Sequence, residues 1–366
     1  GEWEMCKFKD VCSTSTGNKN TQDKIDDGIY PFYVRSQTVE HINSWTFDGE
    51  TILTAGDGVG VGKVFHHTYG KIGVHQRVYI LSNFKCDANY LFHFFSSHFY
   101  NRVKRMSAKN SVDSVRKEMI TEMPLYLPSK QEQTKIGVLL SLLDERISTQ
   151  NKIIDKLQSL IKGLNDSLYA QYGDKVLTSF AELGTSYSGL SGKSAQDFGF
   201  GKPFITYLNV YSNNVINENE FQYVAIKDDE KQNVAEYGDV LFTLSSETPR
   251  EVGIGSVYLG KEKVYLNSFC FGIHITNMEV AFPPYLSYYV SSTAFRKFIY
   301  PYAQGSTRFN LCKADFEKAS IKLPTLENQK RIYLILGHID CKIETERQLL
   351  ALYNSQKQYL LRQMFI

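Results

Sequence analysis

The sequence has 366 residues, of which 42% are hydrophobic and 22% are charged, a composition typical of soluble globular proteins with room for two domains. The formal net charge of +2 is too small to identify a nucleic-acid-binding protein by charge alone. No apolar run approaches the roughly 18 residues that span a bilayer, and the six cysteines form no C-x-x-C pair, so we expect no membrane contact and a cytoplasmic chain with free thiols.

The predicted elements come in the same order in each half of the chain. Alternating or continuous apolar residues predict strands, and longer periodic segments predict helices. Strands are predicted at 51–54, 77–81, 239–243 and 271–275, and the shorter helices at 87–105 and 284–300. A Leu-Pro pair closes each half and precedes a long helix. Each half is therefore predicted to be a mixed α/β domain with a curved sheet.

Both long helices open with the same or similar residues, 196 positions apart. The first set is Leu127, Pro128, Gln133, Lys135, Ile136, Leu140, Asp144 and Ile147. The second set is Leu323, Pro324, Gln329, Arg331, Ile332, Leu336, Asp340 and Ile343. Outside the helices, Phe8 and Gly17 match Phe180 and Gly189. The chain is therefore predicted to be an internal pseudo-two-fold repeat, an architecture suited to reading two separated sites.

Apolar residues in both long helices recur four and three positions apart over four or more heptads, which is the pattern of a coiled-coil seam. Gln150 interrupts the first seam, while Glu346, at the same heptad position, and Lys357 interrupt the second. We expect the two helices to pair antiparallel, with Gln150 and Glu346 fixing the register. The alternative, in which each helix packs separately on its own domain, is disfavoured because surface helices seldom exceed about 25 residues.

The stretch from Phe99 to Lys117 is the strongest candidate for nucleic-acid binding, because it contains six basic residues and only one acid. Cations bind phosphates, while Arg, Lys and Asn read base edges. The polar loop Gln304–Asn310 occupies the equivalent place in the second half. Two different loops at equivalent positions predict two different half-sites. The alternative for the basic stretch is a solvated, charged helix end.

The motifs that would carry catalysis are incomplete. Gly56–Lys63 is similar to a phosphate loop, but Asp57 and Val64 stand where Gly and Ser or Thr are required, so a glycine-rich turn is expected. Phe282–Tyr285 has Phe where the adenine-gripping loop of methyltransferases carries an amide or carboxylate. The histidines between 66 and 75 lack Cys or carboxylate neighbours at metal-ligand spacing. We therefore predict no catalytic residue, no metal and no cofactor in this chain.

Together these features resemble the specificity (S) subunit of type I restriction–modification systems. In that family two target-recognition domains alternate with two helices, each opened by Leu-Pro, Gln, Ile and a Leu-rich stretch with Asp and Ile. Weaker matches are Tyr207–Asn209, Gly238–Leu241 and Gly305–Arg308. The resemblance implies an α+β fold of two mixed α/β domains separated by two long antiparallel coiled-coil helices. The implied boundaries, alternating recognition domain and spacer helix, are 1–127, 128–172, 173–323 and 324–366.

The resemblance further implies a non-catalytic subunit that binds double-stranded DNA, each domain reading one half of a bipartite asymmetric site. It implies two methyltransferase (M) subunits that dock on the helices and carry S-adenosylmethionine, with motor-nuclease (R) subunits as optional partners. The alternatives are the specificity subunit of a type IIB-like enzyme, a diverged fused DNA methyltransferase or nuclease, and a pure assembly protein. The residues predicted to contact DNA are Arg35, Gln37, Lys63, His75, Gln76, Arg102, Lys104, Arg105, Lys109, Asn110, Ser111, Tyr207, Asn209, Arg250, Asn267, Ser306, Thr307, Arg308 and Asn310.

Overall fold

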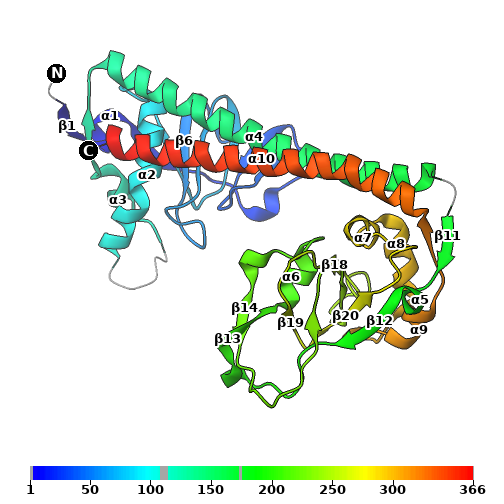
Figure 1. Ribbon diagram of the computed structural model, residues 1–366. Helices are drawn as coiled ribbons and strands as arrows, with labels where there is room; N and C mark the ends of the chain where they lie inside the picture. Colours follow the sequence, from blue (N-terminus) through cyan, green and yellow to red (C-terminus); the bar gives the residue numbers. More distant parts are fainter. Residues whose placement is uncertain (1–2, 108–113, 173–174, 366) are drawn as a thin grey trace. The chain divides into compact units, whose positions relative to one another are not determined.

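The structure, a computed structural model, describes residues 3–107, 114–172 and 175–365 (Figure 1). It forms two compact units, each with its own hydrophobic core. Unit 1 comprises Gly1–Lys152 and Arg347–Ile366, and unit 2 comprises Ile153–Glu346. Both long helices, α4 (Lys130–Gln171) and α10 (Leu326–Met364), therefore contribute to each unit. The predicted four-part boundaries, which treat each helix as a separate segment, stay a prediction.

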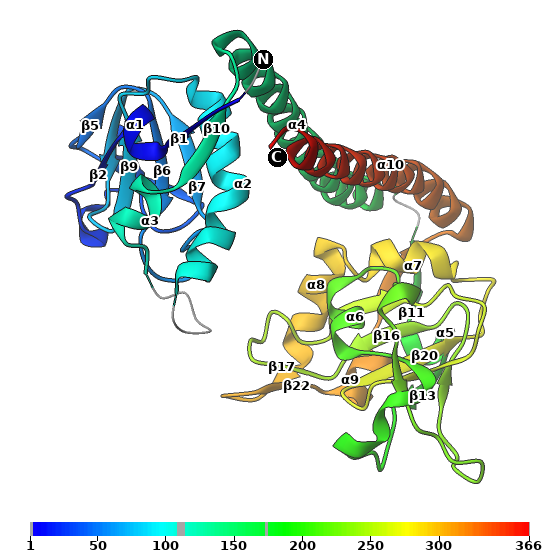
Figure 2. The same ribbon diagram turned by 90° about the vertical axis from the view of Figure 1, so that its left-hand side faces the viewer.

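Unit 1 contains two four-stranded sheets. The first is antiparallel and has the order β2 (Ser13–Thr16), β9 (Val78–Ser82), β6 (Thr51–Ala55) and β7 (Phe65–Thr68). The second has the order β4 (Val39–Ile42), β3 (Tyr30–Tyr33), β8 (Lys71–Val74) and β5 (Phe47–Asp48), with β3 and β8 parallel. Every residue of β6 is buried, because α2 (Ala88–Met106) packs across one face of β6 and β7 (Figure 2) and residues of the second sheet pack on Leu53 on the other face. The pair β1 (Glu4–Lys7) and β10 (Pro124–Leu127), with α1 (Phe8–Val11), η1 (Thr21–Asp23) and α3 (Lys117–Thr121), completes the unit.

Unit 2 repeats this strand order. Its first sheet is β12 (Gly184–Ser188), β20 (Cys270–Ile275), β16 (Val240–Thr243) and β18 (Gly255–Val257). Its second sheet is β14 (Gln222–Val224), β13 (Phe198–Ile205), β19 (Val264–Leu266) and β15 (Val234–Ala235), with β13 and β19 parallel. The pair β11 (Lys175–Thr178) and β23 (Ile321–Pro324) corresponds to β1 and β10. A further sheet has the order β17 (Ser245–Ser246), β22 (Phe309–Leu311) and β21 (Ala303–Gln304).

The helices of unit 2 are short apart from the two long ones. They are α5 (Phe180–Leu183), η2 (Ala195–Asp197), α6 (Tyr207–Ser212), η3 (Glu218–Glu220), α7 (Pro283–Tyr289), α8 (Thr293–Ile299), η4 (Tyr300–Tyr302) and α9 (Lys313–Lys318). The single helix predicted at 284–300 is thus two helices. The helix is interrupted between them because the Ser292 side chain accepts a hydrogen bond from the Phe295 amide at 3.2 Å and caps a new helix.

The duplication predicted from the sequence is confirmed by corresponding strands and hydrogen bonds. The amide of Gly17 donates to the carbonyl of Val78 at 3.1 Å, and that of Gly189 donates to Cys270 at 3.2 Å. All four predicted strands are present, and the predicted fold class of two mixed α/β domains with long helices is confirmed. Along the part of the chain that the structure describes, no helix is both long and apolar enough to cross a membrane.

The long helices run antiparallel within each unit. In unit 1, Lys357 of α10 forms an ion pair with Asp144 of α4, which explains the polar interruption that Lys357 makes in the second seam. Beyond it, Phe365 packs on the rings of Tyr90 and Phe94. In unit 2, Leu168 near the end of α4 joins the same apolar cluster as Ile332 near the start of α10.

Each long helix begins with a buried glutamine that ties it to its own domain. Gln133 donates from Nε2 to the carbonyl of Pro128 at 2.8 Å and accepts from the amide of Asp87 at 3.0 Å. Gln329 does the same in unit 2, with the carbonyl of Pro324 at 2.8 Å and the amide of Phe282 at 2.8 Å. Since all these partners are main-chain atoms, the glutamines hold the helices irrespective of the side chains around them.

Gln150 in unit 1 and Glu346 in unit 2 are both buried, and Lys342 forms an ion pair with Glu346 one helical turn away. Polar side chains therefore occupy the seam at both predicted positions. Their predicted role in fixing the helix register stays a prediction.

We expect unit 1 to lose stability in mild acid because of His93 on α2. This side chain is 1% exposed, its Nε2 lies 3.2 Å from the Ser141 hydroxyl, and burial lowers its pKa from 6.5 to about 4. Between these pH values the unfolded chain binds a proton that the folded chain does not. The stabilisation is therefore complete above about pH 6.5 and is lost as the pH falls towards 4.

The measurement is the unfolding free energy of unit 1 at pH 7.5 and pH 5, followed by the fluorescence of Trp3 and Trp45, the two tryptophans of the chain, which both lie in this unit. His93→Gln should show a smaller decrease than the natural sequence. An equal decrease in both would mean that other groups, such as His66, whose pKa burial also lowers, cause the effect.

Candidate nucleic-acid interface

A cavity of about 750 Å³ in unit 2 is lined by residues of α6, β17 and the turn between β21 and β22. The lining residues are Tyr207, Leu208, Tyr211, Ser245, Ser246, Glu247, Glu251, Thr307 and Arg308. Strands β21 and β22 form a hairpin. This hairpin packs beside β17, because Asn310 and Phe309 of β22 pair with Ser245 and Ser246. The structure thus brings together three residues that the sequence predicted for DNA contact: Tyr207, Thr307 and Arg308.

Arg308 is an exposed cation with a defined orientation. Its guanidinium lies 5.8 Å from the ring centroid of Phe269, and one terminal nitrogen donates to the Ser245 hydroxyl at 3.3 Å. A planar guanidinium of this kind donates two parallel hydrogen bonds to guanine in a major groove. Ser306, Thr307 and Asn310 on the same hairpin are also exposed.

Hydrogen-bond acceptors also line the cavity. Glu251 accepts from the hydroxyls of Tyr211 at 2.8 Å and Thr248 at 2.9 Å, and these hydrogen bonds, that from Tyr211 first, lower the pKa of Glu251. Glu247 is exposed. Because a carboxylate accepts from the amino group of cytosine, donors and acceptors together could distinguish base pairs. Tyr207 lines the cavity with its ring, while its hydroxyl donates to the carbonyl of Ser245 at 2.8 Å.

Corresponding residues of unit 1 occupy the equivalent strand ends. The amide of His75 donates to the carbonyl of Tyr33 at 3.0 Å, just as that of Asn267 donates to Ile205 at 2.9 Å. Arg35 lies two residues after Tyr33, and Tyr207 lies two residues after Ile205. The predicted residues Arg35 and His75 therefore correspond to the predicted residues Tyr207 and Asn267, which sequence matching did not reveal.

The chemistry at this place differs between the units. In unit 1, Arg35 forms an ion pair with Asp57 at 3.0 Å, and Arg77 lies 3.7 Å from the other oxygen of the same carboxylate. Arg77, which the sequence analysis missed, is exposed and corresponds to Phe269 of unit 2. The sequence signal for Arg77 was its position directly after Gln76, which was predicted to contact DNA.

Three of the residues predicted to contact DNA make hydrogen bonds within the fold, and their role in DNA binding stays a prediction. His75 is 4% exposed, and its Nδ1 accepts from the amide of Arg77 at 3.0 Å while Nε2 lies 3.3 Å from the Thr21 hydroxyl. Asn209 is fully buried and exchanges two hydrogen bonds with the main chain of Asn217. Arg102 donates to the carbonyls of Met119 at 2.7 Å and Glu122 at 2.9 Å. All three side chains are used inside the fold.

The remaining predicted residues lie in several places. Gln76 donates to Asn20 at 2.6 Å, Gln37 donates to the carbonyl of Phe65 at 3.5 Å, and Lys63 lies 5.2 Å from the ring of Tyr100. The side-chain oxygen of Asn267 accepts from the amide of Phe269 at 2.9 Å. Lys104 and Arg105 are exposed at the end of α2, and Arg250 is exposed in a separate pocket of unit 2. Lys109, Asn110 and Ser111 lie outside the described residues.

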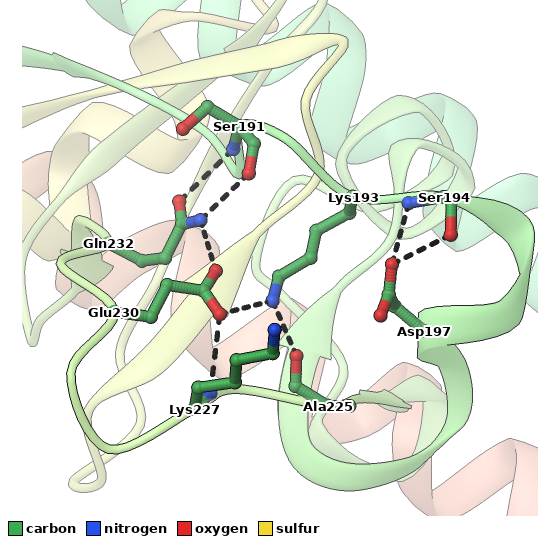
Figure 3. Close-up of polar contacts among 8 residues, drawn as sticks. All are labelled: Ser191, Lys193, Ser194, Asp197, Ala225, Lys227, Glu230 and Gln232. Carbon is green, nitrogen blue, oxygen red and sulfur yellow. Dashed lines mark hydrogen bonds and ion pairs between the residues drawn. The ribbon is translucent and has the colours of Figure 1, made fainter.

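A buried lysine fixes two loops beside the second sheet of unit 2 (Figure 3). The side chain of Lys193 is 8% exposed, and its ammonium donates to the carbonyl of Ala225 at 2.6 Å and pairs with Glu230 at 2.5 Å. Gln232 in turn donates to Glu230 and to the carbonyl of Ser191. The hydrogen bond from Lys193 lowers the pKa of Glu230 to about 2. No sequence pattern predicted this network, which connects the loops that flank β13 and β14.

Among residues 3–107, 114–172 and 175–365, no group of three or more His, Cys, Asp or Glu side chains is placed to hold a metal ion.

Comparison with known proteins identifies relatives. One is the type I restriction enzyme EcoDI specificity subunit of Escherichia coli, 26% identical over 161 residues, which are 44% of this chain and 35% of that protein. Another is the MjaX specificity subunit of Methanocaldococcus jannaschii, 26% identical over 285 residues, which are 70% of this chain and 61% of that protein. The chain thus spans about one third of the length of the Escherichia coli protein and about three fifths of that of the Methanocaldococcus jannaschii protein.

The crystal structure of the type I restriction–modification S subunit from M. genitalium has the same fold, with a TM-score of 0.63 at 15% identity, covering 100% of this chain and 96% of that one. The family model for the type I restriction modification DNA specificity domain matches residues 1–159 and again residues 191–352. The two matches fall on the two halves of the duplication. The chain therefore belongs to the family of type I restriction–modification DNA specificity proteins.

Proposed function

We propose that this chain recognises a bipartite DNA site, with each unit reading a different half. The observation that carries the proposal is that one fold is present twice, with different side chains at the same strand ends. At these positions unit 1 has Arg35, Asp57 and Arg77, whereas unit 2 has Tyr207, Ser245 and Phe269, with Arg308 close to both Ser245 and Phe269. Base edges are distinguished by such donor, acceptor and apolar patterns. Two units with different patterns would recognise an asymmetric site.

We further infer that the chain has no catalytic role of its own and carries two methyltransferase subunits, which supply S-adenosylmethionine, with a motor-nuclease subunit as an optional addition. Support comes from a repeated apolar pair on the long helices. Val138 and Leu139 are 48% and 42% exposed on α4, and Leu334 and Ile335, 196 residues later, are 59% and 40% exposed on α10. Exposed apolar side chains at repeated positions suit two copies of one partner.

The proposal is tested by methylome sequencing of a host that expresses the chain with its methyltransferase partner. We expect one bipartite sequence, methylated in both halves, and no methylation by either protein alone. Methylation by the chain alone would instead support a fused methyltransferase, and a single uninterrupted site would contradict reading by two units.

Arg308→Ala should relax the sequence requirement at one position of one half-site. An arginine that reads a guanine contributes about 1–3 kcal/mol, so binding to the natural site should weaken by roughly fivefold to 150-fold. The measurement is competition binding of the complex to DNA with each base substituted in turn. Lys261→Ala, an exposed cation on another turn of unit 2, should leave affinity and sequence preference unchanged. An unchanged preference in Arg308→Ala would place base reading elsewhere.

Charged substitutions at the repeated apolar pair should remove one methyltransferase subunit. In the variant Leu334→Asp with Ile335→Asp, two exposed apolar contacts become anions that a buried interface cannot accommodate. Mass measurement of the assembled complex should then give one bound methyltransferase instead of two. Leu352→Asp is the control, because Leu352 is 65% exposed on the same helix but corresponds to Lys156 and not to an apolar residue. Two bound subunits in the double variant would exclude this docking surface.

A further inference from the structure

A second pocket of unit 2, with a volume of about 460 Å³, is lined by basic and hydroxyl side chains. The lining residues are Lys162, Arg250, Ser291, Thr293, Arg296, Lys297 and Tyr300. They come from α4, from the loop after β17 and from α8 with its flanking residues. The lining contains four cations and no carboxylate, and it shares no residue with the cavity around Arg308.

Three of the four cations are available to a ligand. Lys162, Arg250 and Lys297 are exposed, and none of them forms an ion pair within the described ranges of the chain. The nearby carboxylate of Asp166 is already occupied, since it accepts from the amide of Thr293 at 2.9 Å and from its hydroxyl at 2.6 Å. The pocket lining therefore keeps three cations without an ion-pair partner in the described ranges, with one negative charge, that of Asp166, beside Thr293.

The fourth cation has a structural role that gives the pocket a fixed wall. The guanidinium of Arg296 donates to the carbonyls of Arg250 at 2.7 Å, Val252 at 2.8 Å and Gly253 at 2.7 Å. These three hydrogen bonds hold the loop that carries Arg250 against α8. The same loop carries Glu247 and Glu251 into the cavity around Arg308, so that one short segment supplies both sites.

We infer that this pocket binds a phosphate group of the DNA backbone beside the half-site that unit 2 reads. The inference rests on the proposed function and deepens it. Cations with hydroxyl donors and without carboxylates bind phosphate, and such contacts set the position of a protein on the duplex without selecting its sequence. Arg250, predicted from the sequence as a DNA contact, is then a backbone contact, while Arg308 reads bases.

Two of the pocket cations, Arg250 and Lys162, have neutral counterparts in unit 1, whereas Lys297 corresponds to Arg102 at the offset of 195 that relates Asp87 to Phe282. Gly253 and Gly62 have the same left-handed backbone, with φ of 63° and 64°, and each follows a buried valine. By this alignment Arg250 corresponds to Val59. Lys162 corresponds, 196 residues later, to Gln358. The two half-sites should therefore differ in their dependence on backbone charge.

The test uses the complex of the full chain with its methyltransferase subunits, and the variant Lys162→Ala with Lys297→Ala. Both side chains are exposed, so the fold should be retained, which the unfolding temperature verifies. Affinity for the natural site is measured across salt concentrations. The slope of log K against log salt should fall by about one for each cation that contacts a phosphate, while the methylated sequence stays the same. The control, Lys156→Ala with Lys261→Ala, removes two exposed cations outside the pocket and should keep the natural slope.

Each other outcome has a definite meaning. A natural slope in the double variant would overturn the inference, and so would a changed methylated sequence, which would indicate base contacts. Inorganic phosphate, compared with chloride at equal ionic strength, tests the ligand chemistry. Displacement of DNA by phosphate from the natural complex but not from the double variant would support the inference, because the free anion would compete with the DNA phosphate for the two lysines. If the natural complex failed to bind any bipartite site, the proposed function itself would be wrong.

Discussion

Replacing residues 1–127 by the corresponding domain of another family member should change one half of the methylated site completely and leave the other half unchanged. The reason lies in how the domain is attached. Strands β1 and β10, at the two ends of the domain, pair with each other, with Glu4 opposite Leu127. Gln133 then holds it through the carbonyl of Pro128 and the amide of Asp87, which are main-chain groups that any sequence supplies. A domain with other side chains can therefore be accepted at this junction.

The exchange has one side-chain requirement. Phe365 at the end of α10 packs on the rings of Tyr90, Phe94 and His98 of α2. A chimera that keeps these three residues should assemble, whereas one with alanine at all three should lose stability through the cavity that forms. Methylome sequencing of the first chimera decides the question. A change in both half-sites would show that the two units do not read DNA independently.

Gln329→Leu should destabilise unit 2 by about 3 kcal/mol or more, since a buried group left without its hydrogen bond costs roughly 1–3 kcal/mol. The substitution leaves three main-chain groups without partners. These are the amide of Phe282 and the carbonyls of Val280 and Pro324, which lie 2.7–2.8 Å from the Gln329 side chain. Leucine has a similar size, so the loss arises from polar groups and not from a cavity.

The measurement is chemical denaturation followed by circular dichroism, with Gln358→Leu as the control because Gln358 is exposed on the same helix. The control should change the unfolding free energy by less than about 0.5 kcal/mol. A loss below about 1 kcal/mol in Gln329→Leu would mean that water or a shifted main chain satisfies the three groups.

Sequence patterns predicted the parts of the fold that depend on local periodicity. The strand at 239–243 and the heptads of both long helices follow from alternation and spacing, which one chain suffices to show. The break at Ser292 was missed because a serine side chain competes for main-chain amides only when the local turn allows it. Such competition is invisible to a count of apolar residues.

The candidate site was harder to predict, since residue type does not reveal burial. Asn209 and Arg308 are both polar residues in segments that match the family, yet Asn209 is fully buried in α6 and Arg308 is exposed in the turn between β21 and β22. Their difference depends on strands distant in sequence, such as β17 beneath the hairpin. The correspondence of Arg35 with Tyr207 likewise became visible only through the pairing of strands.

The sharing of Asp57 by two arginines has a consequence for how the complex would search a genome. Non-specific DNA attracts a protein through uncompensated cations, and a chromosome offers roughly 10⁶–10⁹ wrong sites. At rest Asp57 lies 3.0 Å from Arg35 and 3.7 Å from Arg77, so much of their charge is compensated before DNA arrives. Under the proposed function, only a sequence that offers base acceptors in the right place would replace this internal partner. The carboxylate would then shorten the time spent on wrong sites, and unit 1 would gain speed of search at the expense of general affinity.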